Sequence, residues 1–508
     1  MKSRPLPLWT GPLATAVLYV FCYPRFNAGG WLGWVVLVPF LWAVPRWPLK
    51  RAIRAGGAAG LLAHLGTLYW IYPTCRWGGV GHVVSALALL SLSAYLAVYW
   101  AAFAAAVKMA DGMKIARPFF LAAAWVALEH ARAHLLTGFP WLPLACTQWL
   151  VPKHLPLAAL GGVYAVSFLV ALFNGALALL LDGRLRGEPR WARPAGPAFL
   201  ALAGLTALSV ALWRHPPAEG PALRAAIVQG NIDQYKKWDQ SYEDEIVAAY
   251  TGLTQTAAAA GPALIVWPET AVPGWIPNDE KYLKWVAGLA KAARIPILFG
   301  AVSRQSGRDY NAAFLMSPAG ELIGQYRKRH LVPFGEYAPF QKILGRLDGV
   351  LNSLGSFDAG EDAGVVPGPV PLGVSVCFEG LFPGLVADFS RAGAKVLVNI
   401  TNDGWYRDTA APEQHFAANV LRAVENGRWV LRAANTGLSG FINPRGEVIE
   451  KSELLTAAVI QGPLVPADRE TFYVRHGDWF AGACYLIVLA GAVGFFHKNR
   501  FFRRVPAS

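Results

Sequence analysis

The fold is decided by the segment Gly373-Val374-Ser375-Val376-Cys377-Phe378-Glu379-Gly380, a short β-branched run that ends at a cysteine. The residues that follow, from Leu381 to Asp388, have the pattern of a helix start. A corner of this kind exposes one side chain and directs backbone N–H groups toward whatever that side chain attacks. The sequence therefore predicts a strand-to-helix corner with Cys377 at its tip.

Cys377 is the one cysteine of five that lies in the polar part of the chain; the others, in or beside hydrophobic segments, are Cys22, Cys75, Cys146 and Cys484. An odd count with wide spacing predicts neither a disulfide framework nor a zinc site built from these cysteines. Taken alone, Cys377 is either a buried structural residue at a strand end or a nucleophile. The motifs elsewhere in the chain favour the nucleophile.

The composition predicts a membrane protein. Of 508 residues 55% are hydrophobic and only 15% are charged, and twenty are tryptophans, which gather at membrane interfaces. Eight apolar runs are candidate spans, although the first two are short against the ~20 residues that a span needs: Leu8–Tyr23, Trp31–Val44, Gly56–Tyr72, Val83–Val107, Phe119–Leu136, Leu155–Leu181, Ala198–Trp213 and Trp479–Phe496. We expect seven transmembrane helices in residues 1–214, and an eighth plus a cytosolic tail in 477–508.

Loop charges set the expected orientation. With a cytosolic N-terminus, seventeen basic residues fall on the cytosolic side: Lys2, Arg4, Arg46, Lys50, Arg51, Arg54, Lys108, Lys114, Arg117, Arg184, Arg186, Arg190, Arg193, Lys498, Arg500, Arg503 and Arg504. The opposite short loops carry four, which are Arg25, Arg76, Arg132 and Lys153. This positive-inside bias predicts cytosolic termini and a large segment across the membrane. The net charge of +14 is explained by these clusters, so we expect no nucleic-acid partner.

In residues 215–476 short apolar runs alternate with amphipathic stretches, and this alternation predicts one α/β domain. The predicted strands are Ala225–Gln229, Ala263–Trp267, Ile297–Val302, Ala312–Met316, Val370–Cys377, Lys395–Ile400 and Trp429–Ala433. The predicted helices are Tyr242–Ala258, Lys281–Ala293, Phe382–Arg391 and Glu413–Glu425.

Two further motifs carry chemistry. Glu269 follows the apolar run Leu264–Trp267, and open α/β folds place their chemistry at the carboxyl ends of strands. Lys328 precedes an apolar loop, punctuated by Pro and Gly, that ends in Glu336. A thiol is a strong nucleophile only as the thiolate, so Cys377 needs a base and a cation beside it if it is to act as one. His330 is an alternative base, although a lone histidine among basic residues is more often structural.

A glutamate, a lysine and a cysteine on separate strand ends are the signature of the nitrilase superfamily. Within it the chain resembles the apolipoprotein N-acyltransferases of Gram-negative envelopes, on five ordered motifs: Val-Gln-Gly-Asn at 228–231 followed by Trp238; Trp-Pro-Glu-Thr at 267–270; Lys328 with His-Leu-Val-Pro-Phe-Gly-Glu at 330–336; Cys-Phe-Glu at 377–379; and Asn-Asp-Gly-Trp at 402–405.

The resemblance implies a nitrilase-like αββα sandwich on the periplasmic side of the inner membrane. It implies transfer of a phospholipid acyl chain to the α-amine of the N-terminal, diacylglyceryl-modified cysteine of an apolipoprotein. The implied catalytic residues are Glu269 as base, Lys328 as cationic stabiliser and Cys377 as nucleophile. The implied supporting residues are Trp238, Glu336, Phe378 and Glu379, and Phe378 stands where the family usually has tyrosine.

Two other functions compete with this interpretation. A membrane-tethered amidase or hydrolase would use the same three residues with water as acceptor, but would have no need of eight helices. A transporter or scaffold with an inactive domain would not keep Glu269, Lys328 and Cys377 together. We expect no cofactor and no metal in the reaction. The expected partners are the phospholipid, the apolipoprotein and the bilayer, and a monomer is favoured.

Overall fold

The computed structural model describes residues 9–26, 30–187, 192–215, 220–234, 236–237, 239–337 and 357–504. The chain divides into two compact units. Met1–His215 and His476–Ser508 form a helical unit, and Pro216–Arg475 form an α/β unit.

The helical unit contains these described α-helices: α1 (Thr10–Phe21), α2 (Val38–Ala43), α3 (Leu49–Thr67), α4 (Ile71–Trp77), α5 (His82–Met109), α6 (Arg117–His134), α7 (Ala158–Leu185), α8 (Gly196–Arg214) and α16 (Trp479–Arg504). Among the described residues, three helical stretches are long and apolar enough to cross a membrane: His82–Met109, Pro152–Leu185 and Gly196–Arg214. Shorter apolar helical stretches, the second of them interrupted, lie at Thr10–Phe21, Trp31–Arg46 and Trp479–Phe495. The structure therefore supports a membrane unit, and the count of eight spans stays a prediction.

The second predicted run is not one continuous helix. Trp31–Trp34 form a 3₁₀ turn, and α2 begins only at Val38. Buried Asn174 of α7 accepts a hydrogen bond from the Leu37 N–H at 2.8 Å and donates one to the Gly33 carbonyl at 2.9 Å. Since no water is available in a bilayer core, this side chain satisfies backbone groups that a broken helix leaves open.

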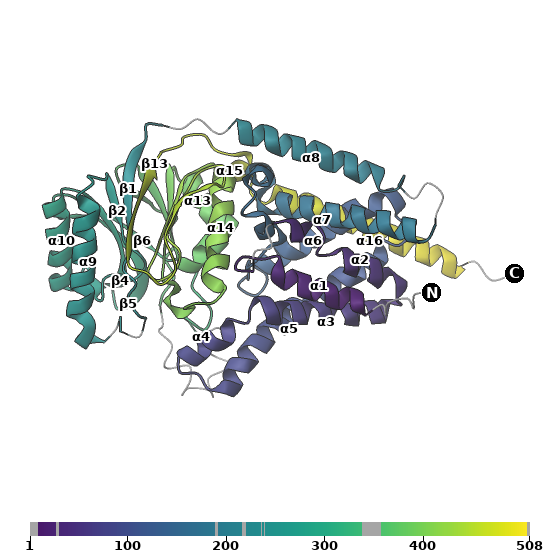
Figure 1. Ribbon diagram of the computed structural model, residues 1–508, viewed down its shortest axis with the longest axis horizontal. Helices are drawn as coiled ribbons and strands as arrows, with labels where there is room; N and C mark the ends of the chain where they lie inside the picture. The colour runs from purple at the N-terminus through teal and green to yellow at the C-terminus, as the bar shows by residue number, and fades with distance from the viewer. Residues whose placement is uncertain are drawn as a thin grey trace. The chain divides into compact units, whose positions relative to one another are not determined.

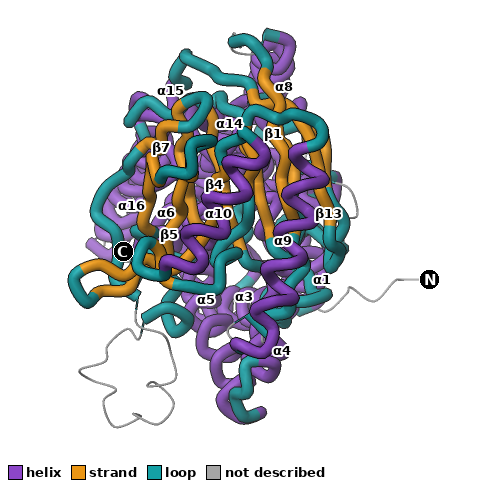
Figure 2. The backbone as a smooth tube through the Cα atoms, turned by 90° about the vertical axis from the view of Figure 1, so that its left-hand side faces the viewer, coloured by secondary structure: helices purple, strands orange, loops and turns teal. Residues whose placement is uncertain are grey.

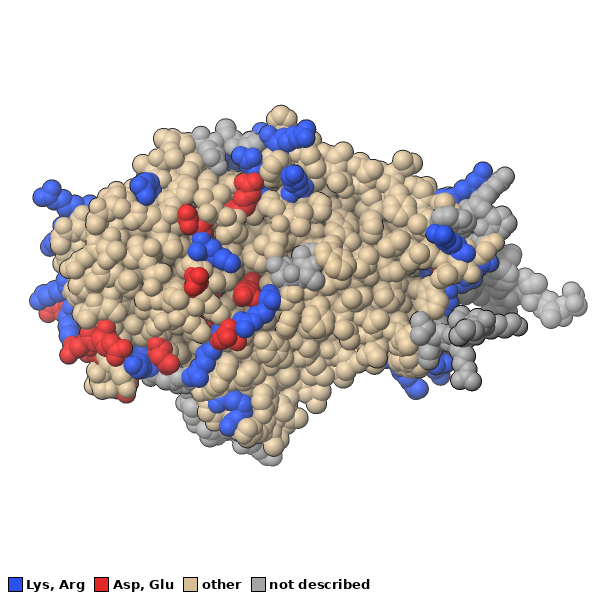
Figure 3. Space-filling model, viewed as in Figure 1, with Lys and Arg blue, Asp and Glu red and all other residues tan. Residues whose placement is uncertain are grey.

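Charged side chains are unevenly distributed over the helical unit. Figure 3 shows a broad zone of this unit without lysine, arginine, aspartate or glutamate on the visible face, with lysines and arginines gathered at one end. An uncharged belt bordered by basic residues is the pattern of a membrane-embedded unit.

The α/β unit has two sheets. One has the strand order β13-β1-β2-β4-β5-β6, with β3 beside β4, and the other has the order β12-β11-β10-β9-β8-β7. The strands of the first sheet are β1 (Leu223–Gln229), β2 (Leu264–Val266), β3 (Trp275–Ile276), β4 (Ile297–Gln305), β5 (Arg308–Met316), β6 (Leu322–Arg327) and β13 (Ala458–Leu464). Those of the second are β7 (Val365–Pro367), β8 (Pro371–Val376), β9 (Val396–Thr401), β10 (Val430–Ala434), β11 (Gly440–Ile442) and β12 (Val448–Lys451).

The sheets are layered face to face between two pairs of helices. Helices α9 (Glu243–Ala258) and α10 (Glu280–Ala293) cover the first sheet, and α13 (Pro383–Arg391) and α14 (Ala411–Asn426) cover the second (Figures 1 and 2). Under α9 and α10, the rings of Trp267 and Phe299 are buried together. All seven predicted strands and all four predicted helices of this unit are present, in the αββα order that the resemblance implies.

Candidate functional site

Cys377 stands directly after β8, at the first residue of a 3₁₀ turn, Cys377–Leu381, that leads into α13. Its φ of +54° is a left-handed conformation that residues with a Cβ seldom adopt, and such strain is common at functional sites. Two side chains hold its carbonyl oxygen: the Asn399 amide donates to it at 3.3 Å, and His415 Nε2 lies 3.1 Å away. The predicted corner is therefore observed, and its geometry is held by buried polar groups.

Glu269 and Lys328 come from the other sheet. Glu269 follows β2 and Lys328 follows β6, and both side chains are almost fully buried. Lys328 Nζ lies 3.7 Å from Glu269 Oε1 and 2.9 Å from Glu336 Oε1. The structure thus brings together three of the predicted residues, Glu269, Lys328 and Glu336.

Asn311 of β5 fixes this arrangement. Its side-chain amide donates to Glu269 Oε1 at 2.7 Å and to Glu336 Oε1 at 2.8 Å. Glu336 Oε2 also accepts from the Val332 N–H at 2.8 Å. This hydrogen bond joins the two ends of the short segment 332–336. The neutral amide of Asn311 therefore holds the Oε1 atoms of both Glu269 and Glu336 in place beside the Lys328 ammonium group.

Electrostatics connect these groups to Cys377. Burial and the nearby Glu269 carboxylate raise the pKa of the Cys377 thiol well above its ordinary value, and the Lys328 ammonium opposes that rise. Burial alone would lower the pKa of Lys328, but the charges of Glu336, Glu269 and the Cys377 sulfur outweigh burial and raise it. Burial therefore favours the protonated form of the Cys377 thiol, and the neighbouring charges favour the ammonium form of Lys328.

Comparison with known proteins identifies the family. Residues 15–176 match the family model "Apolipoprotein N-acyltransferase N-terminal domain", and residues 224–472 match the model "Carbon-nitrogen hydrolase". The apolipoprotein N-acyltransferase of Geobacter metallireducens is 38% identical over 461 residues, which cover 89% of this chain and 88% of the relative. That of Methylococcus capsulatus is 34% identical, with 85% and 84% covered. The chain belongs to the apolipoprotein N-acyltransferase family.

Family membership confirms the predicted class of enzyme, an acyltransferase of lipoprotein biosynthesis, and does not favour the amidase alternative. It also confirms the nitrilase-like α/β domain. A solved structure, Saccharomyces cerevisiae Nit3, a member of branch 10 of the nitrilase superfamily, covers 50% of this chain and 93% of its own at 17% identity and a TM-score of 0.39.

In this N-acyltransferase the buried Glu379 ties the two sheets together. Its Oε1 accepts from the Tyr326 hydroxyl at 2.8 Å and from the N–H groups of Arg329 and His330 at 2.7 and 3.1 Å. Its Oε2 accepts from the Val376 N–H at 2.7 Å. One carboxylate therefore sets the position of the segment after β6, which carries Lys328, relative to the end of β8, which carries Cys377.

Glu379→Gln is expected to destabilise the full-length protein by about 2–4 kcal/mol, because an amide cannot accept from every donor that the carboxylate satisfies. Thermal unfolding followed by tryptophan fluorescence in detergent measures the effect. Glu361→Gln, at an exposed carboxylate of the same unit, is the matched control and should stay within about 0.5 kcal/mol of the parent. Equal stability of both variants would contradict a tying role for Glu379.

Phe378 and His330 belong to an aromatic cluster at this N-acyltransferase site. The Phe378 ring is 7% exposed and lies 5.1 Å from the Phe382 ring, which lies 3.9 Å from the His330 ring. Burial and the neighbouring Lys328 lower the pKa of His330 to about 4. Its neutral ring packs among phenylalanines, so the geometry favours the structural interpretation of His330 over a basic one.

Trp238 lies outside the described residues. The preceding residue, Lys237, was not predicted as a site residue, yet its buried Nζ donates to the Glu269 backbone carbonyl at 2.9 Å. Burial lowers the pKa of Lys237 to about 7. Asn311 was missed as well: it directly precedes the predicted strand Ala312–Met316, and β5 proves to begin earlier, at Arg308.

Proposed function

We propose that Glu269, Lys328 and Cys377 of this N-acyltransferase move an acyl chain from a phospholipid to the α-amine of the N-terminal S-diacylglyceryl cysteine of an apolipoprotein. The observation that carries the proposal is the buried Lys328, 3.7 Å from Glu269 and electrostatically coupled to Cys377. A cation in that position favours both a thiolate and the oxyanion of acyl transfer. The names of the relatives supply the acceptor class.

The first half-reaction forms a thioester. Glu269 takes the Cys377 thiol proton as the sulfur attacks the ester carbonyl of the donor. Lys328, with the Phe378 N–H as a second donor, stabilises the oxyanion. Collapse of this intermediate breaks the ester C–O bond, and the departing glyceryl oxygen takes the proton from Glu269 and leaves as lysophospholipid.

The second half-reaction uses the same groups. The neutral α-amine of the apolipoprotein attacks the thioester carbonyl and gives a proton to Glu269. Lys328 stabilises the second oxyanion, which collapses with cleavage of the C–S bond. The sulfur then regains its proton from Glu269, so that the amide product leaves and the site is restored without any cofactor.

The acceptor is tested with phospholipid supplied together with a synthetic diacylated lipopeptide. We expect the lipopeptide to gain one amide-linked acyl chain while lysophospholipid accumulates in equal amount. Release of free fatty acid with an unmodified lipopeptide would instead assign water as the acceptor and favour a hydrolase.

We propose the bacterial inner membrane as the location, with residues 215–476 in the periplasm and both termini in the cytosol. The basic residues gathered at one end of the helical unit support this orientation (Figure 3). A reporter that works only in the periplasm should be active when inserted after Gly307, in the exposed β4–β5 turn, and inactive when fused after residue 504. The reverse pattern would contradict this orientation.

Phe378→Tyr is expected to keep turnover within about tenfold, or ~1.4 kcal/mol of barrier, because the backbone N–H next to the nucleophile is unchanged. The added hydroxyl must fit at the packed contact with Phe382. Turnover of the lipopeptide measures the effect. Phe378→Leu, which removes the ring, is the comparison, and a loss far above tenfold in the tyrosine variant alone would mean that this contact has no room for an oxygen.

A further inference from the structure

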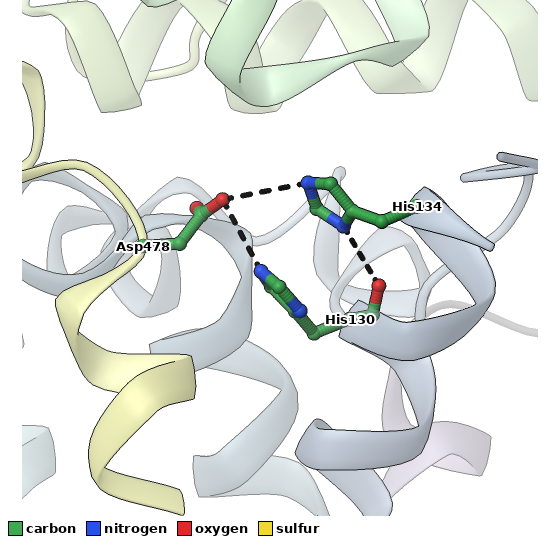
Figure 4. A group of neighbouring side chains, drawn as sticks. All are labelled: His130, His134 and Asp478. Carbon is green, nitrogen blue, oxygen red and sulfur yellow. Dashed lines mark hydrogen bonds and ion pairs between the residues drawn. The ribbon is translucent and has the colours of Figure 1, made fainter. Parts of the chain in front are cut away.

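A second group of chemistry-bearing side chains lies in the helical unit. His130 and His134 are one turn apart at the end of α6, and Asp478 directly precedes α16, so the group joins segments more than 340 residues apart in sequence. Figure 4 shows both imidazoles directed at the Asp478 carboxylate. His130 Nε2 is 3.4 Å and His134 Nε2 is 3.8 Å from the same oxygen, Asp478 Oδ2.

Neighbouring groups fix which nitrogen of each ring bears a proton. His134 Nδ1 lies 2.8 Å from the His130 carbonyl oxygen, and because a carbonyl only accepts, Nδ1–H is the donor. The Tyr485 hydroxyl donates its proton to the Ala127 carbonyl at 2.9 Å, so it accepts from His130 Nδ1–H at 3.3 Å. In the neutral rings, both Nε2 atoms therefore carry a lone pair toward Asp478.

Two lone pairs and a carboxylate oxygen that converge in this way can coordinate one cation. A direct imidazolium–carboxylate hydrogen bond would be about 2.7–2.9 Å long, shorter than either contact to Asp478. A tetrahedral Zn²⁺ with bonds of about 2.0–2.2 Å separates its ligand atoms by roughly 3.4 Å, and these three ligand atoms lie within 4.8 Å of one another. Histidines that donate their other N–H to a carbonyl or a hydroxyl are the usual zinc-ligand arrangement.

We propose that His130, His134 and Asp478 bind one divalent transition-metal ion, Zn²⁺ being the ion that this donor set suits well. The His134 side chain is 53% exposed, which gives the ion a path from solvent and leaves a coordination position for water. The ion would fasten the start of α16 to the end of α6. This role is separate from acyl transfer, and the residues involved are outside the α/β unit.

The test uses the full-length protein in detergent, carrying an affinity tag without histidine and stripped of metal by a chelator. Competition with a chromogenic zinc chelator measures the affinity, and bound Co²⁺ gives a visible absorption spectrum as an independent readout. We expect one ion per chain in the parent. Asp478→Asn and His134→Ala should each weaken binding more than tenfold, and His82→Ala, at another exposed histidine of the unit, should leave it unchanged.

Tyr485→Phe provides a second variant that keeps all three ligands. Loss of the hydroxyl that accepts from His130 should weaken zinc binding by about 10–100-fold. The metal-free chain should stay folded with a slightly lower melting temperature, because the hydrogen bonds to Ala127 and His130 are lost as well. Zinc bound equally well by the parent and by Asp478→Asn would overturn the proposal. So would a parent that takes up no zinc from micromolar solution, in which case the cluster is an imidazolium–carboxylate pair only.

Discussion

Cys377→Ala is expected to abolish both the covalent acyl-enzyme and the transferred product, with turnover falling by more than about 10⁴-fold. Cys377 carries the only thiol or hydroxyl among the described residues of the corner Cys377–Leu381, and its backbone there is strained. Mass spectrometry of the parent incubated with phospholipid alone should find one acyl chain on the Cys377 peptide, removable by hydroxylamine. The alanine variant should carry none.

Kinetics provide an independent check on the thioester. In the proposed mechanism the lysophospholipid leaves before the apolipoprotein enters, so double-reciprocal plots with two substrates should give parallel lines. Cys75→Ala, at a cysteine of the helical unit, is the control and should keep both the adduct and the turnover. Converging lines, or full transfer by Cys377→Ala, would replace the thioester with direct attack by the amine.

The strands that the sequence predicts are buried along most of their length. β1, β4, β8 and β9 appear as near-continuous apolar runs, as parallel strands between layers do. β12 is mostly exposed and lies at a sheet edge, so its residues need no apolar pattern. β13 contains Gly462 and Pro463, both of which argue against a strand in sequence, and it is recognisable only from its antiparallel pairing with β1.

The candidate site could be predicted from the sequence where a functional side chain follows directly after a recognisable strand. Glu269 and Cys377 follow apolar runs that the sequence reveals, and their meeting follows from stacked sheets whose strand ends converge. The sequence does not reveal the hydrogen bonds between side chains that belong to different strands. The contact of Asn311 with Glu269 spans 42 positions, and Glu379 has partners about 50 positions away, so neither could be paired by local spacing.

The same limit explains why His130, His134 and Asp478 were not singled out. Two histidines four residues apart are common on helices, and the third group lies 344 positions beyond His134. Only the packing of α6 against α16 brings them together.

Glu269→Gln is expected to slow formation of the thioester by about 10²–10⁴-fold, since glutamine keeps the size of the side chain but cannot take the thiol proton. The glutamine oxygen can still accept from Asn311, so the site should keep its geometry. Single-turnover acylation from phospholipid, followed by the acyl mass on Cys377, measures the loss.

The pH dependence of this variant separates proton transfer from simple electrostatic support. Burial raises the pKa of Cys377, so at neutral pH little thiolate forms without a base. Below that pKa the thiolate fraction rises about tenfold per pH unit, and acylation by Glu269→Gln should rise with it between pH 7 and 9. If Glu269 removes the proton in the parent, as proposed, acylation by the parent should depend far less on pH over this range.

Glu336→Gln is the matched control because Glu336 also contacts Lys328, at 2.9 Å, and also accepts from Asn311. It removes the same charge from the same ammonium ion but leaves Glu269 in place. We expect this variant to acylate within about tenfold of the parent and with the parent's pH profile. If instead both glutamine variants lost equal activity and neither recovered at higher pH, Glu269 would serve to hold Lys328, and the proton acceptor would have to be sought among the other buried groups around Cys377.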